Sequence, residues 1–130
     1  MSKFEMLTQL IEKGRLEADY EVGNIRFRLR TLTHDQEVAA VEAALGRPYA
    51  IKIEYLTRSI VSLNGKPVSD DVDERNELRE ALGKLAFQYI NAFNEKYVDL
   101  NNKIPKLDKK EDLADPLVQG ALLDQPTKLL

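Results

Sequence analysis

Residues 15–31 contain a β-hairpin whose sequence specifies its own register. If Gly23 and Asn24 form a two-residue turn, the strands place apolar pairs on one face and pairs of opposite charge on the other. The apolar pairs are Val22/Ile25, Tyr20/Phe27 and Ala18/Leu29, and the charged pairs are Glu21/Arg26, Asp19/Arg28 and Glu17/Arg30. A shift by one residue would destroy both sets at once. The three arginines therefore have a structural role before any ligand is considered.

The composition indicates one soluble globular domain. The chain has 130 residues, 43% of them hydrophobic and 32% charged, and no apolar run approaches the roughly 20 residues that cross a bilayer. The first 14 residues lack the apolar core of a secretory signal, so we expect a cytoplasmic protein that does not bind membranes. A net charge of −3 gives no field that would attract nucleic acid, which makes protein partners the expected ligands.

The spacing of apolar residues predicts one helix on each side of this hairpin. The first covers residues 3–13, just before Gly14. The second begins with a capping box formed by Thr33 and Gln36 and ends at Gly46. Its apolar stripe consists of Val38, Val41 and Leu45.

A third helix and a second hairpin follow. The helix is expected to begin at Pro48 and to end near Ser59, because apolar residues recur there at intervals of three and four. Residues 60–68 then form a small hairpin around Asn64-Gly65, a strong turn signal. Since proline cannot donate to a ladder, Pro67 should place the return strand at an edge of the sheet.

A long helix and an extended arm complete the chain. The acidic residues before position 72 are suited to cap a helix over about 72–99, in which Gly83 is a weak point. From residue 101 the chain becomes rich in Lys, Asn and Pro, with a short apolar helix expected after Asp115-Pro116. We therefore predict an α+β domain over residues 1–100, with two hairpins on three or four helices, followed by an arm over 101–130.

The sequence contains little that indicates catalysis. There is no cysteine, His34 is the only histidine, and no glycine-rich phosphate-binding motif is present, so we expect no enzyme activity and no cofactor. The carboxylates at 70, 71, 73 and 74 fit a helix start better than a calcium loop, so no metal site is expected either. Single-strand binders expose aromatic and basic side chains on the same sheet face, whereas alternation places Phe27 opposite the arginines. A nucleic-acid-associated regulator therefore remains the least favoured alternative.

The run from Tyr49 to Val68, with I-V-S-L-N-G-K-P-V over 60–68, resembles the central motif of bacteriophage tail assembly chaperones and baseplate-hub assembly proteins. Residues 25–37 also resemble the strand, the [RP]-L-T segment and the acidic helix that precede this motif in the family. The likeness covers about residues 20–100. It implies a non-enzymatic protein of the host cytoplasm that protects a tape-measure, tail-tube or baseplate-hub protein during tail morphogenesis. The alternative is a permanent minor subunit of the tail or baseplate, located in the virion tail.

Three segments are candidate partner-binding surfaces under this interpretation. They are the edge of the second hairpin, one stripe of the long helix and the apolar part of the arm. Each could instead be an ordinary turn, ordinary core or an unattached terminus, and a homo-oligomer is also left open. The residues are Asn64, Gly65, Val68, Tyr89, Phe93, Tyr97, Leu117, Val118, Leu122 and Leu123.

Overall fold

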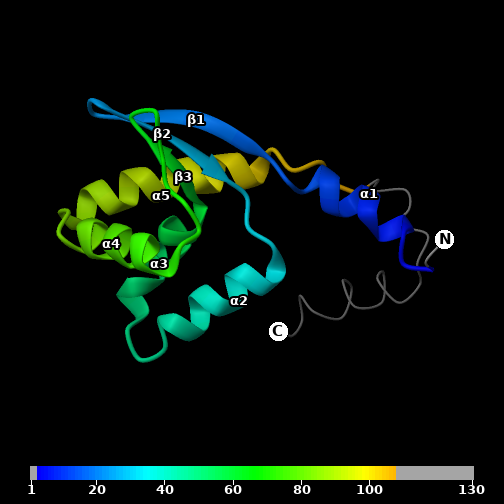
Figure 1. Cartoon of the computed structure of the whole chain (residues 1–130), viewed down its shortest axis with the longest axis horizontal. Coiled ribbons are helices and arrows are strands. Elements are labelled where there is room, and N and C mark those ends of the chain that lie inside the picture. The colour runs from blue at the N-terminus through cyan, green and yellow to red at the C-terminus, as the bar shows by residue number, and fades with distance from the viewer. Residues whose placement is uncertain (1–2, 108–130) are drawn as a thin grey trace, which may run out of the picture.

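The structure is a computed structural model that describes residues 3–107, and it has an α+β fold (Figure 1). A four-stranded antiparallel sheet is covered on one face by helices, and this part of the chain ends shortly after the last helix. The helical elements are α1 (Met6–Lys13), α2 (His34–Ala43), the short 3-10 turn η1 (Pro48–Ala50), α3 (Ile51–Ser59), α4 (Val72–Gly83) and α5 (Phe87–Asn102). The strands are β1 (Glu17–Val22), β2 (Ile25–Arg30), β3 (Ile60–Leu63) and β4 (Lys66–Pro67).

The first hairpin has the register that its sequence specifies. All six expected pairs of β1 and β2 face each other, and Gly23 adopts a φ of 60° at the first turn position, where glycine is favoured. Phe27 and Leu29 are buried beneath the sheet, whereas Ile25, near the turn, is 36% exposed. The apolar face is therefore covered by the helices except at its tip.

The second hairpin joins the first to form a single sheet in the order β1-β2-β3-β4. The turn has positive φ at both Asn64 (49°) and Gly65 (81°), and the two-residue strand β4 lies at the edge, as Pro67 predicts. Between Arg28 and Leu29 the pairing with β3 shifts, so that Leu29 faces Ile60 rather than the residue after it. This bulge turns Ile60 into the core, where it is fully buried.

Helix α3 is the centre of the helical layer, because it contacts α2, α4 and α5 as well as β3. Helix α5 lies across β1 and β2, and the Phe27 and Phe93 rings meet there with centroids 4.6 Å apart. Tyr97 stacks on Tyr55 of α3 at 5.6 Å. These contacts join the sheet and the helices into one core.

The single helix expected over 72–99 is wrong: the chain forms two helices there. Helix α4 ends at Gly83, and α5 begins after Ala86, whose ψ of 148° is extended. Because of the break, α4 packs on α3 while α5 packs on both α3 and the sheet. One straight helix could not have reached both surfaces.

Candidate partner-binding surface

Helix α1 presents an apolar face that the rest of the described chain leaves open. Met6, Leu7, Leu10 and Ile11 occupy positions i, i+1, i+4 and i+5, so they lie on one side of the helix. Each is between 49% and 76% exposed, and α1 has no buried residue. An isolated helix of this length is marginal in water, which makes the face a candidate docking surface.

Helix α2 packs through a different face from the one that the sequence predicts. The predicted packing stripe consisted of its larger apolar residues. It packs against α3, and its buried residues are Ala40 and Ala44, at 0% and 6% exposure. Val38, Val41 and Leu45 face outward instead, with exposures from 39% to 73%. The small side chains let the two helices approach closely, and this places the larger ones in solvent.

A cavity of about 500 Å³ lies between α1, the start of α2 and the segment after α5. Three apolar residues line it, Ile11 from α1, Leu32 from the β2–α2 connection and Ile104. The rest of the lining is mostly polar or charged: Arg15, Glu17, Arg30, Thr31, Thr33, His34 and Gln36. Figure 1 shows that α1 and α2 leave the sheet at the same end, with this connection between them. We refer to this cavity, together with the exposed apolar faces of α1 and α2, as the α1–α2 groove.

One residue at the end of each face lines the cavity. Ile11 belongs to the exposed face of α1, and the α2 stripe continues along the helix face that starts at His34. The floor is fixed by Thr31, whose hydroxyl donates to the Gly14 carbonyl (2.6 Å) and accepts from the Leu16 amide (2.9 Å). The groove therefore has a well-defined base, and Ile11 and His34 connect it to the exposed faces of α1 and α2.

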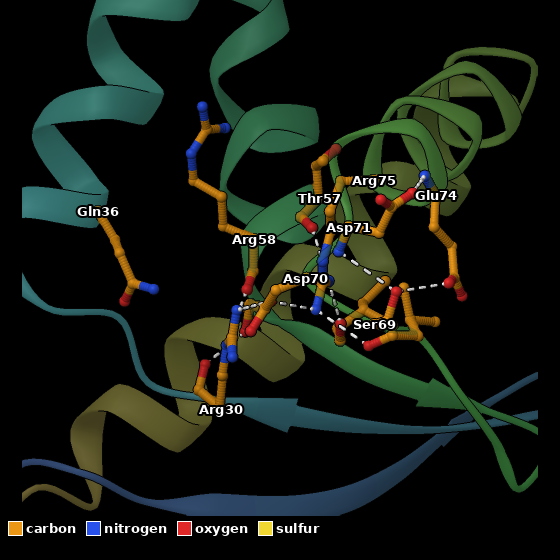
Figure 2. Close-up of polar contacts among 12 residues, drawn as sticks. Arg30, Gln36, Thr57, Arg58, Ser69, Asp70, Asp71, Glu74 and Arg75 are labelled. Atoms are coloured by element: carbon orange, nitrogen blue, oxygen red, sulfur yellow. Dashed lines mark hydrogen bonds and ion pairs between the residues drawn. The ribbon is translucent and has the colours of Figure 1, made fainter.

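Beside the groove, a polar cluster ties the sheet to α3 and α4 (Figure 2). Asp70 lies between Arg30 and Arg75 and accepts a 2.9 Å hydrogen bond from each. Hydrogen bonding to Arg30, aided by the charges of both guanidinium groups, lowers the pKa of the Asp70 carboxyl. Arg75 also donates to the backbone carbonyls of Thr57 (2.9 Å) and Ile60 (2.5 Å), so it holds the junction between α3 and β3.

These contacts correct the expected charge pairs of the first hairpin. Arg30 reaches Asp70 rather than Glu17, and Arg28 takes both Glu17 (2.8 Å) and Asp19 (3.2 Å). Arg26 forms no ion pair within residues 3–107. The backbone register is as expected, but the long arginine side chains choose partners that the fold brings near.

A buried carboxylate joins α3 to α4. Glu54 is 1% exposed and accepts hydrogen bonds from Arg58 (2.8 Å) and from Nε and Nη2 of Arg79 (3.0 and 3.1 Å). Desolvation is the largest single influence and would raise the pKa of Glu54, but the hydrogen bonds from both arginines outweigh it and lower that pKa. The carboxylate is thus held ionised in the core as a structural tie.

The predicted partner-binding residues of the second hairpin have structural contacts of their own. The Asn64 side-chain oxygen accepts a 2.9 Å hydrogen bond from the Arg26 amide, and the Asn64 amide donates to the Arg26 carbonyl. Asn64 and Gly65 also line a cavity of about 400 Å³, together with Arg26. Val68 is partly buried against the core. The turn between β3 and β4 is therefore attached to β2 through Asn64, and both Asn64 and Gly65 remain exposed.

The stripe proposed on the long helix does not lie on one surface. Phe93 and Tyr97 are 3% and 5% exposed, so the interpretation that they contact a partner is corrected: they are core residues. The Tyr97 hydroxyl donates to Glu37 (3.1 Å), and burial together with that carboxylate raises the pKa of Tyr97. Tyr89 alone is available, at 53% exposure.

The remaining predicted residues lie outside the described residues. They are Leu117, Val118, Leu122 and Leu123 of the arm.

Sequence reasoning missed Glu54, Arg79 and the two open helix faces. A signal for the ion pairs was present, because Arg75 and Arg79 are like charges one turn apart and such a pair needs acceptors opposite it. No comparable signal showed that Val38, Val41 and Leu45 of α2 face outward. The alanines and the larger apolar residues recur with the same helical period, so the pattern does not show which of the two faces is buried.

Two further observations concern residues 3–107. No helix in this part is both long and apolar enough to cross a membrane. No three His, Cys, Asp or Glu side chains in it are grouped so that they could hold a metal ion.

Comparisons with protein-family models, with curated proteins and with solved structures found no match to this chain.

Proposed function

We propose that this protein binds an apolar segment of a phage tail component during assembly, and that the α1–α2 groove is its binding surface. The observation that carries the proposal is the face of Met6, Leu7, Leu10 and Ile11, exposed on a helix that buries nothing. The motif over residues 60–68 supports the phage context. The client would be a tape-measure, tail-tube or baseplate-hub protein, whose own apolar surface needs cover before assembly.

The size of the α1 face suits reversible binding. One half of a helix about 12 Å long and about 11 Å across offers roughly 200 Å². Burying that area is worth roughly 5 kcal/mol for each partner at about 25 cal/mol per Å². Association costs about 4–15 kcal/mol, so the net affinity is modest. A protein that must later release its client to the growing tail requires a modest affinity.

The test is binding of a purified client fragment, such as a tape-measure helix, by titration calorimetry. Leu10→Glu places a charge in the exposed face and should weaken binding at least tenfold, because the charge would have to be desolvated in the complex. Gln9→Glu adds the same charge on the polar side of α1 and is the matched control. Circular dichroism should show that both variants fold, since α1 has no buried residue.

Equal affinities for Leu10→Glu and Gln9→Glu would exclude α1 from the binding surface. If no tail protein binds the unmodified chain, the proposed function itself is wrong.

A second measurement separates a chaperone from a virion subunit. Mass spectrometry of purified particles should find none or only traces of a chaperone, whereas many copies per particle would establish the permanent subunit instead.

A further inference from the structure

The described chain ends three residues after Ile104, which lines the cavity of the α1–α2 groove. Ile104 lines the same cavity as Ile11, and Figure 1 shows the segment after α5 running toward α1. Leu107, the last described residue, is 61% exposed. Whatever follows Leu107 therefore starts beside an uncovered apolar helix face.

The following sequence contains a segment that matches this face. Residues 113–123 carry one charge, Asp115, and residues 108–112 and Asp124 on either side are charged. The apolar positions 117, 118, 121 and 122 follow the spacing i, i+1, i+4, i+5, which is also the spacing of the exposed residues of α1. In a helical turn, which Asp115-Pro116 is suited to start, this spacing would place the four residues on one side.

The connection is also long enough. Residues 108–112 can span about 16–18 Å when extended. Helix α1, with eight residues, is about 12 Å long. The connection is therefore longer than α1, and its length allows the segment 113–123 to lie along the α1 face.

We propose that residues 113–123 dock in cis in the α1–α2 groove and cover the apolar face of α1. Under the proposed function, on which this second step rests, the docked segment competes with the client. The client can then bind only after residues 113–123 have left the groove. The apparent affinity of the groove for the client therefore falls as the affinity of the groove for residues 113–123 rises.

A second copy of the chain is a less suitable occupant. The half-cylinders of α1 and α2 together offer roughly 500 Å², below the ~800 Å² per partner of a standard interface. A tethered segment does not need that area, because a short linker gives it an effective concentration in the millimolar range. With an intrinsic Kd of about 100 µM and about 1 mM effective concentration, the groove would be occupied about 90% of the time.

Paramagnetic relaxation in the full-length chain tests the docking. The protein has no cysteine, so Gln119→Cys introduces a single site for a spin label on the polar side of the segment. The label should broaden the amide signals of Leu10 and Ile11. A label at Glu80→Cys on α4, at the opposite end of the molecule (Figure 1), should leave them sharp.

Three results would overturn the docking. One is sharp α1 signals with the label at position 119. Another is broadening that persists when Leu117→Glu and Leu122→Glu are added to the labelled chain. The third is broadening in a mixture of spin-labelled ¹⁴N protein and unlabelled ¹⁵N protein, which would show that a second copy occupies the groove.

Client titration tests the competition separately. Leu117→Glu/Leu122→Glu should bind the client about tenfold more tightly than the unmodified chain, since the groove would no longer be about 90% occupied. Gln119→Glu should bind like the unmodified chain. Equal affinities for all three proteins would refute the competition. Absence of client binding by every variant, with broadening still present, would refute the proposed function and leave the docking intact.

Discussion

The buried contact between Glu54 and Arg79 offers the sharpest test of the core. Replacing Arg79 by Met keeps a long unbranched side chain but removes the guanidinium group, whose Nε and Nη2 donate three hydrogen bonds to the carboxylate. Glu54 is 1% exposed in the unmodified chain, and the variant would leave it only Arg58 as a charged partner. The substitution therefore leaves a buried carboxylate incompletely paired.

The expected cost is about 3 kcal/mol. Removal of one partner of a buried ion pair costs about 3–5 kcal/mol, and the lower end applies because Arg58 remains 2.8 Å from Glu54. For a folded part of this size, 3 kcal/mol corresponds to a fall of roughly 12–15 °C in Tm. Arg26→Met is the matched control, because it makes the same replacement at an arginine with no ion pair within residues 3–107, and it should cost less than about 0.5 kcal/mol.

Urea unfolding followed by circular dichroism measures both variants, and unchanged m-values would show that the surface exposed on unfolding is unchanged. A second substitution checks the mechanism. Glu54→Leu in the Arg79→Met background removes the stranded carboxylate, so the double variant should be more stable than Arg79→Met alone. If Arg79→Met and Arg26→Met cost the same, or if Glu54→Leu adds to the loss, the carboxylate is not a buried tie and the reasoning is wrong.

Other parts of the fold give shorter tests. Gly65 has a φ of 81°, so Gly65→Ala should cost about 1–2 kcal/mol in urea unfolding, whereas Gly83→Ala, in open space without positive φ, should gain about 0.5 kcal/mol. Phe93→Ala should lower the free energy of unfolding by about 3–5 kcal/mol and Tyr89→Ala by less than about 1 kcal/mol, because Phe93 is buried and Tyr89 is exposed. Equal losses would contradict this difference in burial. The pKa of Glu54 is lower in the folded chain than its ordinary value of 4.5, so its contribution is fully present above pH 4.5 and is lost as the pH falls through the folded pKa. The fall in stability below pH 4.5 should therefore be shallower for Glu54→Gln, and an unchanged profile would count against the pairing.

The first hairpin could be predicted because two independent patterns agree on one register. Charged pairs and apolar pairs both require Gly23-Asn24 at the turn, and the six observed strand pairs follow. The partner of Arg30 could not be predicted in the same way. Asp70 lies 40 positions later in the chain, and only the folded arrangement of β2 and α4 brings it within 2.9 Å.

The break between α4 and α5 escaped prediction for a different reason. Leu78, Leu82, Leu85, Tyr89 and Phe93 keep helical spacing straight through the break, so periodicity alone shows one helix. Gly83 marks the place, but nothing packs within 4 Å of a Cβ there, so it is not needed for a close crossing. The break follows from tertiary packing, since α4 and α5 must cover different surfaces.

An amphipathic pattern predicts that one face of a helix is buried, but it does not show which part of the protein or which partner buries it. In α2, burial of Ala40 and Ala44 against α3 satisfies one face, and the valine stripe that the sequence emphasises is left in solvent. In α1, no face is buried, although its pattern is as regular as that of any core helix. Two neighbouring helices with open apolar faces around one cavity are difficult to explain by folding of residues 3–107 alone, because burial of such surface is the main stabilising contribution available to them. Under the two proposals above, the cover comes from the chain's own arm in one state and from a client in the other, and both would use the same face of α1.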